Sequence, residues 1–227
     1  MKSYLARPAL ALAVSLALAS CGGGGKETYP VKVTVANVKY PGLILTTNGM
    51  EVAVPVPATA GATSVVTFPN GLDYGQRYDV VPKGGTAAGG GAQPAHQNCV
   101  TSGYPREYGT AGQTASLESA RTAAIEVFYT CSINILPLGG KVTGLTSGTL
   151  TLINGSNATT VVTGVTTSNE IAFSLPAVPF GSTYGVSVLT QPDGFTCSVA
   201  NGVGTMDQAA EDAKGATNVL VSCVPNT

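Results

Sequence analysis

Hydrophobic and polar residues alternate along short stretches of this chain, which is the pattern of half-buried β-strands. In the C-terminal part, Leu150 shares a side with Leu152, and Cys223 shares a side with Val219 and Val221. Glycine-containing turns separate seven such stretches, at about 140–145, 149–153, 158–163, 170–175, 183–190, 196–200 and 217–223. Seven short strands at this spacing predict a β-sandwich.

The chain repeats itself once. Residues 42–49 align with 148–155, and residues 74–80 match 180–186 at the same offset. Cys99 and Cys131 of the first copy also correspond to Cys197 and Cys223 of the second. The sequence therefore predicts two homologous domains of ordinary size, at 31–132 and 133–227.

The first copy departs from the second in two insertions. Residues 83–97 are rich in Gly and Ala without periodicity, which we interpret as a mobile loop. Residues 103–121 are polar, and 116–121 are expected to form a helical turn. The second copy has a similar helical turn at 208–214, which Gly215 would end.

Two segments, Gly75-x-x-Tyr78-x-Val80 and Gly181-x-x-Tyr184-x-Val186, resemble a strand of fibronectin type III and prealbumin-like modules. Both tyrosines are expected in the core. The unit is also similar to a repeat of bacterial surface lipoproteins, on the residues Gln191-Pro192, Cys197 to Gly204 and Asn218 to Cys223. We interpret the first copy as lacking the Gln-Pro and Asn-Gly pairs. The resemblance implies an architecture and no activity.

The N-terminus has the features of an export signal. Lys2 and Arg7 are the only charges in 1–20, and the apolar run 9–19 is shorter than the roughly 20 residues of a membrane-spanning helix. The stretch Leu18-Ala19-Ser20-Cys21 resembles the lipobox of bacterial lipoproteins. It implies that 1–20 are removed and that Cys21 is acylated, ahead of a flexible glycine-rich linker at 21–30. The alternative is ordinary cleavage after Ala19.

This anchor defines the expected location. Several acyl chains on Cys21 would hold the protein stably at a membrane. Gly22 is not the aspartate that resembles an inner-membrane retention signal, so we expect a cell-envelope lipoprotein of the outer membrane. Only 10% of the residues are charged and the formal net charge is −1, so nucleic-acid binding has no electrostatic support.

The four repeat cysteines are interpreted as two disulfides. No Cys-x-x-Cys pair suggests a zinc or redox site, and disulfides persist in exported proteins. Strand parity turns the cysteines inwards, and the repeat requires the same pairing in both copies, so we infer Cys99–Cys131 and Cys197–Cys223. The alternative is two pairs of free buried thiols. The predicted fold is all-β: two tandem Ig-like β-sandwiches of about seven strands, each with one disulfide.

No residue is predicted to be catalytic, and no metal or cofactor is expected. His96 is the only imidazole, and we interpret it as a solvent-exposed loop residue rather than a base or a metal ligand. The expected function is a non-enzymatic envelope lipoprotein with a structural, adhesive or binding role. A protein or glycan ligand would bind at the insertions 83–97 and 103–121. The alternatives are a periplasm-facing accessory subunit, which would expose an apolar patch or an open strand edge, and a hydrolase that relies on His96.

The lipobox makes a direct prediction. Cys21→Ser removes the only sulfur that can take up the diacylglycerol, so the variant should lose lipid labelling and leave the membrane fraction. Metabolic labelling with a fatty-acid analogue and fractionation of the cells measure both. A wild-type chain that takes up no label, with a variant that still sediments with membranes, would contradict the lipobox.

Overall fold

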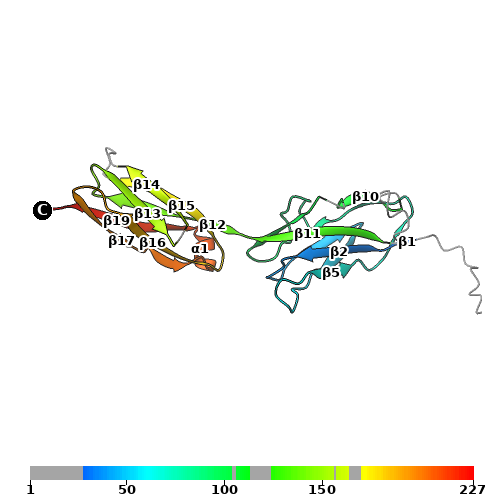
Figure 1. Ribbon diagram of the computed structural model, residues 1–227. Coiled ribbons are helices and arrows are strands. Elements are labelled where there is room, and N and C mark those ends of the chain that lie inside the picture. Colours follow the sequence, from blue (N-terminus) through cyan, green and yellow to red (C-terminus); the bar gives the residue numbers. More distant parts are fainter. Residues whose placement is uncertain (1–27, 104–105, 113–123, 156, 164–169) are drawn as a thin grey trace, which may run out of the picture.

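Two β-sandwiches lie end to end in the computed structural model (Figure 1), which describes residues 28–103, 106–112, 124–155, 157–163 and 170–227, with only the backbone of 157–163. The export signal, Cys21 and the helical turn expected at 116–121 lie outside the described residues. Within the described part of the chain, no helix is both long and apolar enough to cross a membrane.

Domain 1 is the N-terminal sandwich. One sheet has the order β5-β2-β11-β9, formed by Ser64–Thr67, Val31–Ala36, Ile125–Ile133 and Gln97–Thr101. The facing layer contains β4-β3-β8 and the pair β10-β7, formed by Met50–Ala53, Ile44–Thr47, Val81–Pro82, Tyr108–Thr110 and Arg77–Asp79. A short pair, β1 (Thr28–Tyr29) with β6 (Leu72–Asp73), lies at the end remote from domain 2 (Figure 1).

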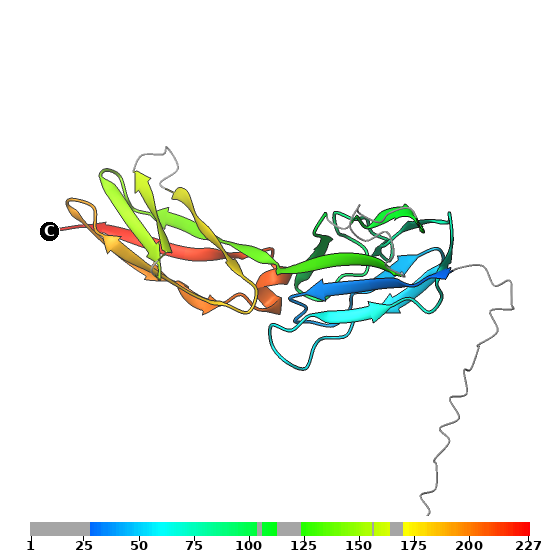
Figure 2. The ribbon, with the colours of Figure 1, turned by 45° about the vertical axis from the view of Figure 1, so that its right-hand side comes forward.

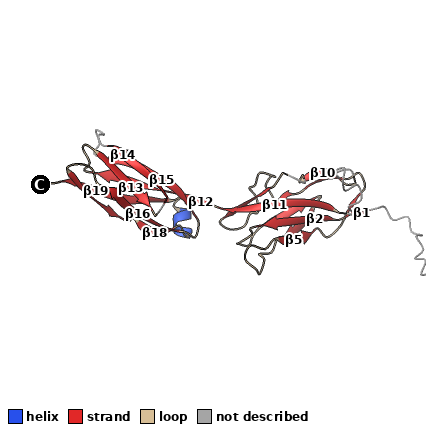
Figure 3. Ribbon diagram, viewed as in Figure 1, coloured by secondary structure: helices blue, strands red, loops and turns tan. Residues whose placement is uncertain are grey.

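Domain 2 repeats this plan with longer strands. Its first sheet has the order β15-β12-β19-β17, formed by Glu170–Pro179, Ile135–Thr143, Ala216–Pro225 and Phe195–Ala200. Its second sheet has the order β14-β13-β16-β18, formed by Asn157–Thr163, Thr149–Asn154, Thr183–Thr190 and Val203–Thr205. One short helix, α1 (Gln208–Asp212), lies at the end of domain 2 that faces domain 1 (Figure 3).

In both domains the first and last strands of the sheet that carries the disulfide are parallel neighbours: β2 pairs with β11, and β12 pairs with β19. Each sandwich has a buried core of its own. One core is built from residues between Val31 and Cys131, and the other from residues between Leu136 and Cys223. The two-sandwich fold with one disulfide in each domain is therefore the one that the alternation predicted. The strand that the sequence missed in domain 2 is β18, whose three residues are too few to show a period.

Each disulfide joins directly opposed residues on neighbouring strands. Cys99 on β9 faces Cys131 on β11, with an S–S distance of 2.00 Å and a Cα–Cα distance of 3.9 Å. Cys197 on β17 faces Cys223 on β19, at 2.07 Å and 4.0 Å. Such close Cα atoms are typical of the non-hydrogen-bonded pairs of an antiparallel ladder. The backbone groups of the edge-strand cysteines therefore point away from the sheet.

A glutamine occupies that open edge in each domain. The amide of Gln191 accepts from the Cys197 N–H (2.8 Å) and donates to the Cys197 carbonyl (3.0 Å). Gln93 makes the same two bonds with Cys99, at 2.8 and 3.1 Å. The interpretation that the first copy lacks the Gln-Pro pair is wrong, because Gln93-Pro94 precedes Cys99 as Gln191-Pro192 precedes Cys197. The side-chain amide satisfies backbone groups that an edge strand otherwise leaves unpaired.

The Gly/Ala-rich stretch 83–97 is not the mobile loop that its composition predicted. Its backbone forms a hydrogen-bonded hairpin, in which Gly85 donates to Pro82 (2.8 Å) and Ala92 donates to Lys83 (2.9 Å). Gly91 has a φ of +68°, and a Cβ there would lie 2.4 Å from the Lys83 carbonyl oxygen. The glycines allow two backbone segments to approach closely, a role that composition alone does not distinguish from flexibility.

The tyrosines of the repeat are placed differently from one another. Tyr78 is buried, whereas Tyr184 is partly buried against the core of domain 2. A third tyrosine, Tyr129 on β11, bonds a buried backbone group: its hydroxyl donates to the Val80 carbonyl at 2.7 Å. Burial, followed by the negative charges of Glu107 and Asp79, raises the pKa of Tyr129. Tyr129 alternates with Ile125, Val127 and Cys131 along β11, which places its side chain inwards, but alternation does not identify the partner of its hydroxyl.

The glutamine contact predicts a loss of stability. Gln191→Ala leaves the N–H and carbonyl of Cys197 without a protein partner, so the free energy of unfolding of domain 2 should fall by about 1–2 kcal/mol. Urea unfolding followed by circular dichroism measures the change. Gln208→Ala, which removes an exposed glutamine from the same domain, is the matched control and should change stability by less than about 0.5 kcal/mol. Equal losses in the two variants would contradict the role of Gln191.

Candidate functional site

The two sandwiches are joined by a single residue, Asn134, between the end of β11 and the start of β12 (Figure 2). Its backbone is bonded to both domains. The Asn134 N–H donates to the His96 carbonyl of domain 1, and its carbonyl accepts from the Phe180 N–H of domain 2, both at 2.8 Å. The link is therefore part of a hydrogen-bonded network, unlike the exposed flexible linkers that usually separate domains.

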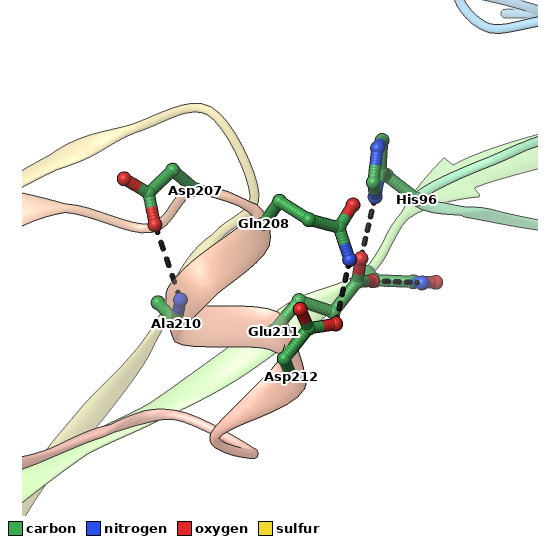
Figure 4. A network of polar contacts seen from close by, with 7 residues as sticks. His96, Asp207, Gln208, Ala210, Glu211 and Asp212 are labelled. Atoms are coloured by element: carbon green, nitrogen blue, oxygen red, sulfur yellow. Dashed lines mark hydrogen bonds and ion pairs between the residues drawn. The ribbon is translucent and has the colours of Figure 1, made fainter.

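A carboxylate completes this network. Glu211 on α1 accepts from the side-chain amide of Asn134 (3.0 Å) and contacts Nδ1 of His96 (2.5 Å; Figure 4). The side chains of His96 and Glu211 are 17% and 23% exposed, so both are largely withdrawn from solvent. The hydrogen bond from Asn134, and then the contact with His96, lower the pKa of Glu211 from its usual 4.5 despite the opposing effect of burial. The glutamate is thus held as an anion between the domains.

Aromatic rings pack beside the carboxylate. The imidazole of His96 stacks on Phe180 of domain 2, with centroids 3.6 Å apart and an interplanar angle of 5°. Tyr40 meets His96 edge-on at 5.1 Å and Phe180 edge-on at 6.0 Å. We call His96, Tyr40, Asn134, Phe180 and Glu211 the interdomain joint. It combines ring contacts with a charge-assisted hydrogen bond in one place.

The short helix α1 positions Glu211 because both of its ends are fixed. The side chain of Asp207 accepts from the Ala210 N–H (3.1 Å), which is the usual N-cap bond (Figure 4). At the other end Lys214 donates to Glu211 (2.9 Å) and Gly215 donates to Ala210 (2.7 Å), the two bonds of a Schellman motif. The helical turn predicted at 208–214 is therefore present. It brings an acidic side chain to the domain boundary.

His96 has a left-handed backbone conformation, and the equivalent position of the second copy is occupied by a glycine. Gln97 donates to Pro94 in a turn whose third residue, His96, has a φ of +58°. In domain 2, Phe195 donates to Pro192 in the equivalent turn, and the third residue is Gly194 with a φ of +76°. A left-handed conformation is costly for a residue with a Cβ. Domain 1 tolerates this cost where the histidine contacts domain 2.

The interpretation of His96 as a solvent-exposed loop residue is therefore wrong. Nothing in the local sequence shows that the turn at 94–97 packs against another domain. Among the described residues, the side chain of His96 contacts Glu211, Phe180 and Tyr40, and none of these is a Ser, Thr or Cys that could act as a nucleophile. Among the described residues, no group of three His, Cys, Asp or Glu side chains could hold a metal ion.

A second candidate site is an open depression of about 740 Å³ on domain 1. It lies over β7 and β10, and β10 belongs to the insertion 103–121, of which the structure describes 103 and 106–112. The guanidinium of Arg106 lies 5.5 Å from the ring centroid of Tyr108 and also contacts its hydroxyl. The residues that line the depression are Asn48, Arg77, Tyr78, Asp79, Tyr108, Gly109 and Thr110.

One residue that lines the depression, Asn48, has a structural role that its equivalent in the second copy shares. The side chain of Asn48 donates to the Arg77 carbonyl of β7 at 2.8 Å. The equivalent Asn154 accepts from the Gly185 N–H of β16, also at 2.8 Å. Asn48 directly follows β3 and Asn154 is the last residue of β13, and each holds the adjacent strand, β7 or β16, in place. The insertion 83–97, in contrast, contributes to the interdomain joint rather than to this depression.

Comparisons with known proteins return distant structural likenesses. No family model and no curated protein matches the chain. It is similar to the C-terminal fragment of the pilus adhesin SpaC from Lactobacillus rhamnosus GG, with a TM-score of 0.37 and 11% identity over 88% of this chain and 99% of that one. It is also similar to the major pilin protein T-13 from Streptococcus pyogenes, with a TM-score of 0.29 and 13% identity over 89% and 98% of the two chains.

The left-handed histidine predicts that the joint can be removed without unfolding domain 1. His96→Gly places the residue of the second copy in the same turn, so domain 1 should stay folded while the ring stack and the bond to Glu211 are lost. Backbone ¹⁵N relaxation should then show separate, shorter rotational correlation times for the two domains, against one long shared time in the wild type. An unchanged shared correlation time would contradict the joint.

The lowered pKa of Glu211 predicts that the interdomain joint is lost at acid pH. Its pKa is lower when the joint is closed, so its contribution is complete above about pH 4.5 and is lost as the pH falls through the lower folded value. Relaxation measured from pH 7 to pH 3 should show the wild-type domains uncoupling at the acid end. Glu211→Gln should weaken the coupling at neutral pH and remove this pH dependence, whereas Glu170→Gln, on an exposed strand, should leave both unchanged.

Proposed function

We propose that the protein is a non-enzymatic lipoprotein of the bacterial cell envelope with a load-bearing structural or adhesive role. Acylated Cys21, the last residue of the lipobox, would anchor it in the outer membrane. The observation that carries this proposal is the parallel pairing of the first and last strands within each sandwich, together with the one-residue link between the sandwiches.

The molecule has the layout of a rod. The strands β11 and β12 span Ile125–Thr143 with only Asn134 between them, which corresponds to about 60 Å of extended chain. Strand β1 lies at the end of domain 1 remote from domain 2, and the C-terminus lies at the opposite end of domain 2 (Figure 1). A chain anchored before Thr28 would therefore hold domain 2 away from its anchor.

Tension between the two ends acts along the paired terminal strands. In domain 1 the load enters at β2 and leaves at β11, and these parallel neighbours share six paired positions, from Val31↔Ile125 to Ala36↔Thr130. Pulling the start of one strand against the end of the other shears all of their hydrogen bonds together, whereas a hairpin opens one bond at a time. Domain 2 repeats the arrangement with β12 and β19.

The disulfides would limit how far each sandwich can extend. They join β11 to β9 and β19 to β17. Force leaves the two domains through β11 and β19, so these strands stay attached to a neighbour even after their pairing with β2 and β12 has broken. We also propose that each sandwich folds as an independent unit at 31–132 and 133–227, because each has its own core and its own disulfide. Such a layout suits a spacer or an adhesin that works under tension.

Force spectroscopy on the full mature chain held at its two ends tests this proposal. We expect two separate abrupt unfolding events, one for each sandwich, because parallel terminal strands yield cooperatively. After reduction of the disulfides the events should release roughly 110 Å and 90 Å of additional chain, from enclosed segments of 32 and 26 residues. Gradual extension without discrete events would contradict a load-bearing role.

A further inference from the structure

The depression on domain 1 presents four side chains on the outer face of the β7–β10 pair. The register places Arg77 opposite Thr110 and Asp79 opposite Tyr108. The residues between them, Tyr78 and Gly109, also face each other, and Tyr78 is buried. The outer face thus carries two opposite charges, a hydroxyl and an aromatic ring within two strands.

The second copy of the repeat shows what the fold needs at these positions. In domain 2 the pair β16–β18 has the same inner contact, Tyr184 opposite Gly204. Its outer positions hold Thr183 opposite Thr205 and Gly185 opposite Val203. The sandwich therefore forms without any charged or aromatic residue on this face. The side chains of Arg77, Asp79 and Tyr108 are an addition of domain 1 that its architecture does not require.

The charged groups of Arg77 and Asp79 on this face are not paired with another side chain within the described part of the structure. Other exposed charges on the strands are paired, as Lys32 is with Glu126 and Lys141 with Glu170. The guanidinium of Arg77 and the carboxylate of Asp79 have no hydrogen-bond or ion-pair partner among the described residues. Tyr108 is 48% exposed, and the guanidinium of Arg106 holds its ring.

We propose that this face binds a saccharide. A sugar hydroxyl both donates and accepts, so adjacent hydroxyls can pair with the donors of Arg77 and the acceptor oxygens of Asp79 at once. The exposed ring of Tyr108 offers a flat apolar surface to the C–H face of a pyranose. The volume of about 740 Å³ lies within the roughly 300–1,000 Å³ typical of small-molecule sites.

The charges on this face favour a saccharide over the other envelope ligands. A phosphate group could accept from Arg77 but has no donor for the carboxylate of Asp79, and a lipid tail would leave both charges without partners. This inference rests on the proposed adhesive function and names the class of ligand that domain 1 would take. Its test uses no force and leaves β2 and β11 intact, so its failure is distinguishable from failure of the load-bearing role.

Affinity electrophoresis of the intact mature protein tests the inference. Native gels are cast with dextran or galactomannan as neutral polysaccharides, or with alginate as a polyuronate. We expect at least one polysaccharide to retard the wild-type protein. Arg77→Thr and Tyr108→Val introduce the residues of domain 2, and each should weaken that binding about tenfold or more, which is about 1.4 kcal/mol.

The control variant is Lys141→Thr, which removes one exposed positive charge from a strand of domain 2 and should bind as the wild type does. Circular dichroism should show that all three variants are folded. The saccharide assignment is overturned if no polysaccharide in the set retards the protein, or if retardation survives both substitutions. Binding to an immobilised protein such as collagen that is lost in both variants, without any retardation by a polysaccharide, would also overturn it.

Discussion

One continuous line of hydrogen-bonded backbone, from β11 through Asn134 into β12, determines how the rest of this molecule is arranged. On each side of Asn134 the strand is paired with a parallel neighbour, β2 in domain 1 and β19 in domain 2. With a single residue between the strands, the domains have little freedom to turn unless the bonds of that residue break. The interdomain joint is built around those bonds, with Glu211 accepting from the side chain of Asn134.

The internal repeat separates what the fold requires from what one domain has added. Gly75 donates to Ala111 (3.0 Å), as Gly181 donates to Met206 (2.7 Å), and both acceptor residues are fully buried. The glutamine that covers the cysteine of the edge strand is likewise present in both domains. Shared contacts of this kind belong to the architecture. Positions where one domain departs from the other, at His96 and on the outer face of β7–β10, are where a specific role is expected.

Strand alternation and the repeat were sufficient to predict the sandwich fold, because each depends on residues close together in sequence or on a comparison of two aligned segments. Val219, Val221 and Cys223 face the core as their spacing requires. The joint could not be predicted in this way. Alternation says whether a side chain points inwards, but the contact of His96 with Glu211 depends on how two domains pack, across 115 residues of sequence. The Gln93-Pro94 pair was present in the sequence but was obscured by the glycines around it.

The left-handed conformation of His96 links the stability of domain 1 to the presence of domain 2. Domain 1 bears the conformational cost of a non-glycine residue in that turn whether or not its partner is docked. The ring stack with Phe180 and the bond to Glu211 offset this cost only when the domains are in contact. In the full chain, the contacts with domain 2 therefore offset a conformational cost that domain 1 alone would bear. The interdomain joint thus stabilises the arrangement of the two domains at Asn134, the residue about which they could otherwise bend.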